Sequence, residues 1–237
     1  MKIVRSIRRL RAYPGYVGDL FRYLRSPGAE SWSSISLRPM LEDKTATTGF
    51  DAHYVYLGAW AFRHIVTHRP ERHVDVGAQI GWVTCLASIT QVVFLDVRPF
   101  PGSVENLRSQ AGDVLALPFG DVELSSLSCL HVAEHIGLGR YGDAIDPLGT
   151  RKAIGELARV LAVGGRLYFA LPVGRPQVVF NAHRIHDPTT ISRWFGEEGL
   201  RVEEFAAVDD RGRFCPDADP PDFREQRYAC GMYLVRR

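Results

Sequence analysis

The chain of 237 residues has little of what several large classes of protein depend on. Its few cysteines, at positions 85, 129, 215 and 230, show no metal-type spacing and no disulfide framework. No apolar run reaches the roughly 18 residues that span a bilayer, and the N-terminus lacks a signal-peptide core. The formal net charge is only +2, which by itself does not argue for nucleic acid. We therefore expect a cytoplasmic protein with no metal and no nucleic-acid partner.

What the chain does have is ample material for a core. Hydrophobic residues make up 46% of it and charged residues 24%, as in ordinary globular proteins. The simplest organisation is one α/β domain over residues 49–237, preceded by a basic helical extension and linker or lid over residues 1–48.

One stretch, residues 73–83, organises the rest. A β-branched run reaches Asp75 and is followed by a turn that contains Gly77, and an apolar-periodic segment starts at Ile80. This pattern is typical of a buried parallel strand that turns into a helix whose N-terminus faces a ligand. We expect Gly77 to supply unusual backbone angles or close approach, and Gly81 to let the helix pack onto the strand.

The glycine spacing matches no dinucleotide fingerprint, because G-x-G-x-x-G is missing and only Gly77-x-x-x-Gly81 is present. The context nevertheless points to a nucleotide-like ligand. A second strand, residues 91–96, ends in Asp96 about 20 residues after Asp75, where a ribose-binding carboxylate belongs. A third signal follows in the segment Gly112-Asp113-Val114-Leu115-Ala116-Leu117-Pro118-Phe119.

Together with Leu-Ala-Val-Gly-Gly-Arg-Leu at residues 161–167, these motifs resemble class I S-adenosylmethionine-dependent methyltransferases. From Pro39 onward the chain also resembles a bacterial branch of that superfamily known as a domain of unknown function. The segments that carry this second resemblance are 43–45, 128–132, 137–143 and 181–184. The resemblance implies S-adenosyl-L-methionine as cofactor. The residues it assigns to cofactor binding are Asp75, Gly77, Ala78, Gln79, Gly81, Asp96, Asp113, Val114 and His131.

Within that set the implied contacts differ. Asp96 would accept from the ribose hydroxyls, Asp113 and the Val114 amide would meet adenine, and Asp75 with residues 77–79 would meet the methionine end. An alternative for Asp113 is a turn-capping acid. Gln79 stands where many relatives have a glycine, so its side chain must point away from the cofactor if binding is to be unimpaired.

The apolar pattern predicts a Rossmann-like, open, mostly parallel sheet of seven strands with helices on both faces. The strands are expected at residues 73–77, 92–96, before 112, 122–130, 166–172, 200–208 and 228–236. Helices are expected at 50–68, 101–108, 150–161 and 188–198, the third ending at Gly164-Gly165. By the resemblance, the last strand is antiparallel. Residues 209–226 would then be an active-site flap or a mobile surface loop.

The segment after the fourth strand reads His131-Val132-Ala133-Glu134-His135, which has the form of an inverted zinc-protease motif. That interpretation is rejected because His131 directly follows a strand, whereas the motif needs one continuous helix. Residues 134–141 instead resemble the Glu-His-x-Gly-x-x-Arg-Tyr stretch of cyclopropane fatty acid synthases, which borders the transferred methyl group. Glu134 and His135 are therefore candidate catalytic residues, and Arg140 and Tyr141 candidates for substrate binding. The alternative is that Glu134 caps a helix and His135 packs against the sheet.

The segment after the fifth strand supplies Asn181, His183 and Arg184. A hydroxyl acceptor must lose its proton as it attacks a methyl group, and a neutral imidazole suits that step near pH 7. His183 is the first choice as base and His135 the second. Asn181 and Arg184 are expected to hold sugar hydroxyls or an anionic group.

Residues 1–25 contain seven Lys or Arg and one acid, Asp19. Ile3, Val4, Ile7 and Leu10 recur at helical spacing, which predicts a basic amphipathic helix broken near Pro14-Gly15 and followed by a second short helix. Such an arm suits peripheral contact with anionic lipid or a glycan carrier. A solvated extension or an arm exchanged in a homodimer is the alternative.

The combined hypothesis is an S-adenosylmethionine-dependent methyltransferase that methylates a hydroxyl of a saccharide or glycolipid in polysaccharide biosynthesis. Its rivals are a lipid or small-metabolite acceptor, a non-catalytic scaffold that keeps the fold, and a nucleotide-dependent oxidoreductase. Nucleic-acid methylation ranks low, because the Asn/Asp-Pro-Pro-aromatic signature is missing after the fourth strand.

Overall fold

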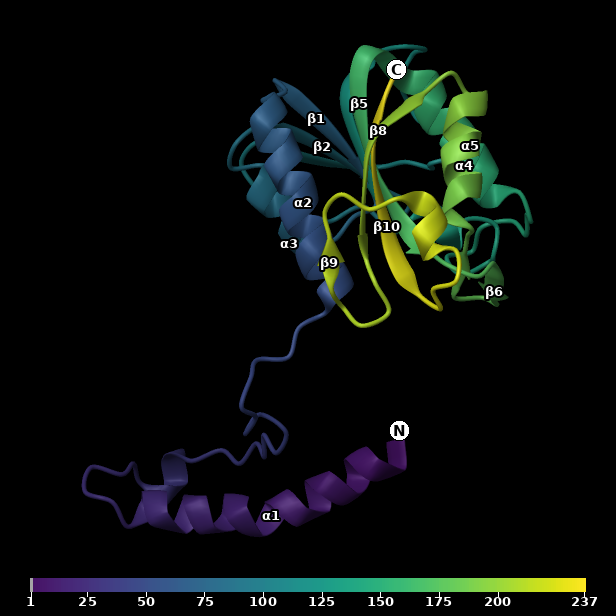
Figure 1. Cartoon of the computed structure of the whole chain (residues 1–237). Coiled ribbons are helices and arrows are strands. Elements are labelled where there is room, and N and C mark those ends of the chain that lie inside the picture. The colour runs from purple at the N-terminus through teal and green to yellow at the C-terminus, as the bar shows by residue number, and fades with distance from the viewer. Residues whose placement is uncertain (1) are drawn as a thin grey trace. The chain divides into compact units, whose positions relative to one another are not determined.

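The computed structural model describes residues 2–237, with side chains described from Leu10 onward. The chain divides into two compact units, residues 1–50 and residues 51–237 (Figure 1).

The first unit is built on one helix, α1 (Lys2–Leu24), followed by an irregular segment with a single 3-10 turn, η1 (Trp32–Ser34). The predicted break at Pro14-Gly15 is wrong, because α1 continues through Pro14. A proline removes one backbone donor, and a long helix can accommodate this loss by kinking rather than ending. The expected grouping of Ile3, Val4 and Ile7 lies outside the described side chains. Within this unit the Lys44 ammonium lies 2.9 Å from the Asp19 carboxylate.

The second unit is an α/β domain built on one large sheet. Its eight-stranded sheet has the order β3-β2-β1-β4-β5-β10-β8-β9, and β10 runs antiparallel to both of its neighbours. The strands are β1 (Arg72–Val76), β2 (Gln91–Asp96), β3 (Leu107–Ala111), β4 (Leu124–Leu130), β5 (Leu161–Val173), β8 (Arg201–Val208), β9 (Phe214–Cys215) and β10 (Ala229–Arg236). The predicted Rossmann-like, mostly parallel sheet with an antiparallel last strand is confirmed, and β9 extends it at one edge.

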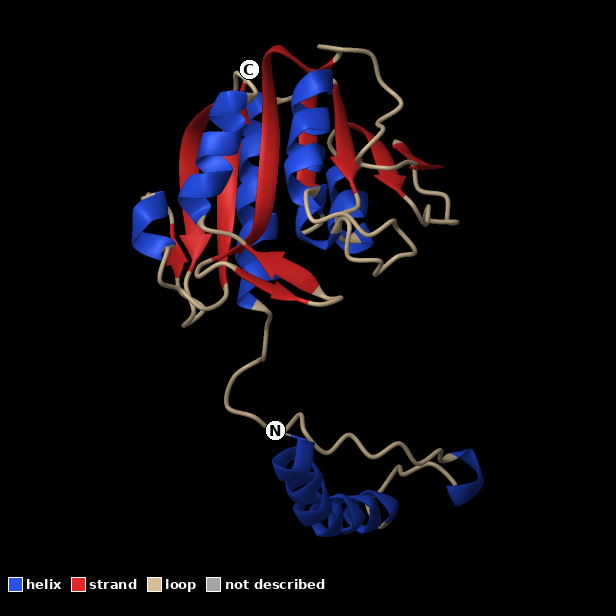
Figure 2. Cartoon of the chain, turned by 90° about the vertical axis from the view of Figure 1, so that its right-hand side faces the viewer, coloured by secondary structure: helices blue, strands red, loops and turns tan. Residues whose placement is uncertain are grey.

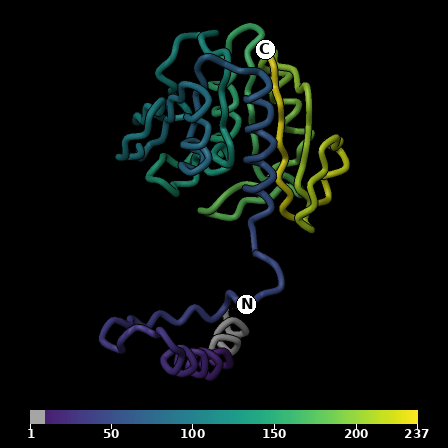
Figure 3. Tube along the Cα trace, turned by 90° about the vertical axis from the view of Figure 1, so that its left-hand side faces the viewer, coloured from purple at the N-terminus to yellow at the C-terminus, as the bar shows by residue number. Residues whose placement is uncertain are grey.

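Helices cover both faces of this sheet, as Figure 2 shows. On one face α2 (Ala52–His68) and α3 (Ile80–Leu86) pack on residues such as Tyr168 and Met232. On the other face α4 (Gly149–Val160) and α5 (Pro188–Glu197) pack on residues such as Phe169 and Tyr233. Because side chains alternate along a strand, neighbouring residues of β5 and β10 serve opposite cores. Helix α2 runs beside β10 (Figure 3).

Local sequence explains where these helices begin. The Asp51 carboxylate accepts from the backbone amides of His53 and Tyr54, so it caps α2 and fixes His53 in the first turn. Asp187 caps α5 in the same way, with Pro188 as the first helical residue. Both caps lie at the edge of the sheet where the parallel strands end.

Three local predictions are wrong. Residues 101–108 form no helix, because the chain makes a bridge between Val104 and Leu107 and enters β3 directly. Gly164 and Gly165 do not end α4, which stops at Val160; they lie inside β5, next to an irregularity in its pairing with β4. Gly81 does not serve close packing, because a Cβ built on it meets no atom within 4 Å.

The remaining elements lie in the connections. Residues Gln177–Val179 (β6) and His183–Ile185 (β7) form a two-stranded hairpin after β5, and Ala133–His135 (η2) is one 3-10 turn after β4. A further turn, η3 (Pro220–Phe223), precedes β10. Among the described residues, no helix has both the length and the hydropathy needed to cross a bilayer.

Candidate active site

The turn after β1 is held open by backbone geometry at Gly77. Its φ of +67° is unfavourable for residues with a side chain, and a Cβ there would lie 3.0 Å from a methyl of Val132. The same hypothetical Cβ would lie 3.7 Å from Asp96 Oδ2, so the glycine leaves open the space between the turn and the end of β2. A ligand can approach the backbone closely at this point.

Asp75 supports the turn from within the protein. It is fully buried, its Oδ1 accepts from the Ala78 amide at 3.0 Å, and the Ser128 hydroxyl donates to its other oxygen. Burial raises the pKa of Asp75 to about 7. Asp75 does not line either of the two pockets at this edge, so its contacts are with the turn rather than with ligand space.

The first pocket, which we call the nucleoside pocket, is lined by Asp96, Asp113 and Val114, the residues that the resemblance assigns to ribose and adenine. Gly77 of the turn also lines it. Asp96 Oδ1 accepts from the Arg98 amide at 2.7 Å, and its Oδ2 is the oxygen that faces Gly77. Asp113 Oδ1 accepts from the Leu115 amide at 2.8 Å. Asp113 therefore caps its turn, as the alternative interpretation expects, and also borders the pocket.

The second pocket is a cavity of about 610 Å³ that adjoins the first, which we call the histidine cavity. The two share residues from the ends of β1, β2 and β4, namely Gly77, Asp96, Arg98, His131, His135 and Tyr141. Ala78 and Gln79 line the cavity from the glycine turn. Gln79 is exposed, precedes α3 and borders the cavity.

A chain of polar contacts lies at the base of the cavity, where β4 ends. His131 Nδ1 is 2.9 Å from Glu134 Oε1, and His131 Nε2 is 3.4 Å from Cys230 Sγ in β10. Burial alone opposes charge on His131, but Cys230 and Glu134 outweigh it and raise its pKa well above the ordinary value. Burial likewise opposes charge on Glu134, yet the hydrogen bond and charge of His131 lower the pKa of that carboxyl. Glu134 Oε2 is buried without a hydrogen-bond partner in the described chain.

Two candidate general bases, His183 and His135, also line the cavity. His183, in β7, lines the cavity with its ring 5.0 Å from that of Tyr228, and burial lowers its pKa below 6.5. Within the described part of the chain, no partner hydrogen-bonds its ring nitrogens. His135 is more constrained, because its Nδ1 donates to the Ala182 carbonyl at 2.7 Å. Of the two, His183 has the freer imidazole.

Arg140 and Tyr141 lie on the cavity rim. The Arg140 guanidinium donates to the Ala182 carbonyl at 2.9 Å, and the Tyr141 ring stacks under the Arg98 guanidinium at 4.4 Å. Arg98, which follows β2, thereby joins the nucleoside pocket to the rim. The sequence did not single out Arg98.

The prediction for Arg184 is wrong, because its side chain is buried in the protein. Its guanidinium donates to the carbonyls of Ile136 and Asp146, the latter at 2.9 Å, and so fixes the segment after β4. Asn181 is exposed and lines neither pocket. Of the two polar residues expected to hold the acceptor from this segment, neither reaches the cavity.

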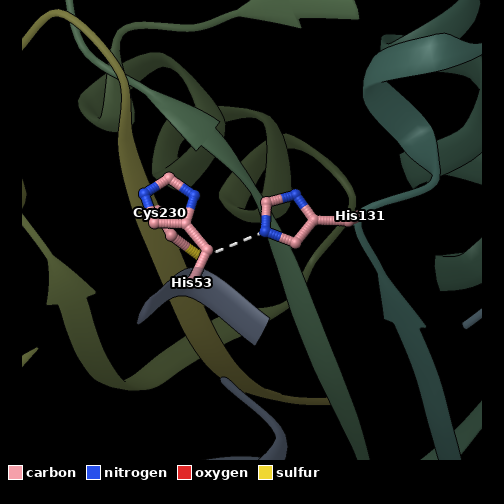
Figure 4. A group of neighbouring side chains, drawn as sticks. All are labelled: His53, His131 and Cys230. Atoms are coloured by element: carbon pink, nitrogen blue, oxygen red, sulfur yellow. Dashed lines mark hydrogen bonds between the residues drawn. The ribbon is translucent and has the colours of Figure 1, made fainter. Parts of the chain in front are cut away.

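Sequence reasoning missed the residues that helix α2 and the segment before β10 bring to the cavity. Tyr54 is exposed and lines the cavity. His53 stacks on Tyr228 with ring centroids 5.2 Å apart, and both line the cavity. His53, His131 and Cys230 place one ligand atom each within 4.8 Å of one another (Figure 4). Isolated residues of this kind carry no spacing signal.

The connection 209–226 is tied down along much of its length. It includes β9 and η3, Phe223 is buried in the core, and Asp210 accepts from the amides of Arg227 and Tyr228. Asp209, Asp210 and Gly212 border a recess next to His53. Only this first part of the connection lies beside the cavity.

Known proteins share the fold of this chain. One solved structure is 1,6-didemethyltoxoflavin-N1-methyltransferase of Burkholderia thailandensis with bound 1,6-didemethyltoxoflavin and S-adenosylhomocysteine. It has 14% sequence identity and a TM-score of 0.54, and the match covers 76% of this chain and 79% of that protein. A Bacillus halodurans protein provisionally assigned as a methyltransferase has 15% identity and a TM-score of 0.54, over 76% of this chain and 97% of its own. The expected class I methyltransferase fold is thus confirmed.

A third solved structure with this fold is the [4+2]-cyclase SpnF, with 14% identity, a TM-score of 0.58 and coverage of 82% of this chain and 84% of its own. The family model described as "Caenorhabditis protein of unknown function, DUF268" matches residues 123–197, from β4 to α5. No curated protein matches the chain. The comparisons therefore establish the fold and not the acceptor.

Proposed function

We propose that this protein is an S-adenosylmethionine-dependent methyltransferase. One observation carries the proposal: the nucleoside pocket and the histidine cavity share Gly77, Asp96 and His131, so a bound nucleoside would point into a space that contains candidate bases. A methyltransferase needs this juxtaposition of cofactor and acceptor.

The residues of the first pocket suit the cofactor. The Asp96 carboxylate has one oxygen directed toward the glycine turn, where a ribose diol would donate to it. Gly77 leaves room for the cofactor to approach the backbone closely. The side-chain amide of Gln79 offers a hydrogen-bond donor and an acceptor to the methionine end of the cofactor. The cofactor supplies a sulfonium leaving group, so most of the protein's task is to position the acceptor.

His183 is the proposed base. Burial lowers the pKa of His183, so its imidazole is neutral near pH 7 and takes the acceptor proton as the new bond forms. Glu134 and His135 border the same cavity, where they hold the surrounding groups in place. In-line attack then follows from orientation within the cavity.

For the acceptor we propose a hydroxyl on a saccharide or glycolipid. The support is the lining of the histidine cavity, where Tyr54, Arg140, Tyr141 and Tyr228 offer both stacking surfaces and polar groups. A lipid or small metabolite is the alternative. The [4+2]-cyclase SpnF shares this fold, so a function other than methyl transfer is a second alternative.

Transfer of a radiolabelled methyl group tests the proposal directly. The protein is incubated with methyl-labelled S-adenosylmethionine and, in separate reactions, saccharides, lipid extracts and small hydroxylated metabolites. Label on the saccharide or glycolipid fraction is expected. Label confined to another fraction would correct the acceptor, and cofactor binding without any transfer would favour the scaffold.

The first unit suggests where such an acceptor is met. In α1 the exposed Leu10, Val17 and Phe21 fall on one stripe, and basic residues dominate the rest of the helix surface. A basic amphipathic helix of this kind lies in the surface of an anionic membrane. We propose that residues 1–25 place the enzyme on such a surface. A cytoplasmic location is consistent with this proposal and stays a prediction, as does homodimer formation.

Vesicle sedimentation measures this contact. The full chain should bind vesicles that contain 30% phosphatidylserine, and its affinity for them should fall about 10-fold at high salt. The variant Leu10→Ala/Phe21→Ala should bind weakly, because apolar burial is lost. Trp32→Ala, which lies outside α1, is the matched control. Equal binding by all three proteins would assign α1 another task.

A further inference from the structure

Where the His131 side chain reaches Cys230, beyond the carboxyl end of β4, the chain places three potential metal ligands that the catalytic scheme leaves without a task. His53 belongs to the first turn of α2, His131 follows β4, and Cys230 lies in β10 (Figure 4). They are 78 and 99 residues apart in the chain, and the fold brings their ligand atoms within 4.8 Å of one another.

The distance between two of the ligands already matches a metal site. In tetrahedral zinc coordination, Zn–S of about 2.3 Å and Zn–N of about 2.0–2.1 Å put sulfur and nitrogen about 3.5 Å apart. Cys230 Sγ lies 3.4 Å from His131 Nε2. A cation can therefore replace the proton between them with little movement of β4 or β10. The third ligand, His53, is only partly buried, and its ligand atom lies within 4.8 Å of the other two.

The surroundings of His131 have the second feature of a metal site. Metal-bound histidines usually donate their other ring N–H to a carboxylate, which fixes the ring orientation. Glu134 Oε1 lies 2.9 Å from His131 Nδ1, so Nε2 is the nitrogen turned toward Cys230 and His53. The other oxygen of Glu134 is buried without a hydrogen-bond partner in the described chain, although Glu134 lines the histidine cavity. A water or acceptor hydroxyl on the metal would supply that partner.

We propose that His53, His131 and Cys230 bind one zinc ion, with a fourth position open to the histidine cavity. Three protein ligands and an open position are typical of catalytic rather than structural zinc. The ion would hold the acceptor hydroxyl and lower the pKa of its proton. This last step rests on the proposed methyltransferase function, whereas the binding of zinc does not. The sequence-based expectation of no metal arises because the three ligands have no common spacing.

The test uses the full chain, stripped with a chelator and titrated with Co²⁺ as a spectroscopic probe, without cofactor. One equivalent of Co²⁺ should produce a thiolate-to-cobalt charge-transfer band, and one equivalent of Zn²⁺ should abolish it. Cys230→Ser should lose the band, and Cys85→Ser, which removes an exposed thiol, should keep it. Glu134→Gln should keep the band but bind zinc about 10- to 100-fold more weakly.

His53→Ala provides a variant that leaves the core intact, because this side chain lies at the cavity edge. It should weaken zinc binding by at least as much as Glu134→Gln, with an unchanged circular dichroism spectrum. Absence of the band in the wild type, or a band that survives Cys230→Ser, would overturn the proposal. Cofactor binding is measured separately, so loss of the metal site and loss of the methyltransferase function remain distinguishable.

Discussion

Replacing His183 by Gln should slow methyl transfer about 100- to 10,000-fold while cofactor affinity stays unchanged, because a positioned general base contributes a factor of this size. Glutamine retains hydrogen-bonding groups of similar size but accepts no proton near pH 7. The wild-type rate should also depend on pH in one direction. A base acts when neutral, and burial lowers the pKa of His183, so the rate should be flat at about pH 7 and fall as the pH drops below that lowered pKa.

Two variants make this result specific. His135→Gln should have a much smaller effect, because the Nδ1 of His135 is engaged by the Ala182 carbonyl. His64→Gln, in the C-terminal half of α2, is the control for loss of a histidine that does not line the cavity. If His135→Gln abolished transfer and His183→Gln did not, the base would be His135.

Replacing Asp96 by Asn should weaken the binding of S-adenosylhomocysteine about 10- to 100-fold. The loss corresponds to one hydrogen bond to a charged group, about 1.5–3 kcal/mol, which asparagine replaces only in part. The amide oxygen of asparagine still accepts from the Arg98 amide, so the end of β2 keeps its conformation. The measurement is the dissociation constant from calorimetric titration, with thermal unfolding as a check on stability.

Asp217→Asn is the matched control for this change of charge, because Asp217 is exposed and lines neither pocket. It should leave the dissociation constant unchanged. An Asp96→Asn variant that bound as tightly as the wild type would remove Asp96 from the ribose site. The shared edge of the two pockets would then need another explanation.

The sheet was predictable because it depends on short-range signals. Apolar runs end at Asp75 and Asp96, and a positive φ at Gly77 requires the glycine that the sequence provides. Failures occurred where that signal is weak. Strand β9 has two residues, and β6 is exposed throughout, so neither carries an apolar pattern. The segment 101–108 is short, so tertiary contacts override its helix propensity.

The site was predictable only on one side. Residues of the nucleoside pocket follow directly after strands, and strand order brings them together, so a motif identifies them. The histidine cavity combines the glycine turn, the end of β2, α2, the segment from the end of β4, β7 and Tyr228, which precedes β10. His53, Tyr228 and Cys230 are single residues whose meaning comes from tertiary contacts alone. Arg184 shows the reverse error, because a charged side chain in a loop was assigned to ligand and is instead buried against backbone carbonyls.

The central claim is that the two pockets bind a methyl-donor nucleoside, and calorimetric titration of the wild-type chain tests it most directly. S-adenosylmethionine, S-adenosylhomocysteine and NAD are titrated one at a time. The first two should bind with micromolar dissociation constants, and NAD should not bind, because its G-x-G-x-x-G fingerprint is missing. Binding of NAD alone, or of none of the three, would contradict the account.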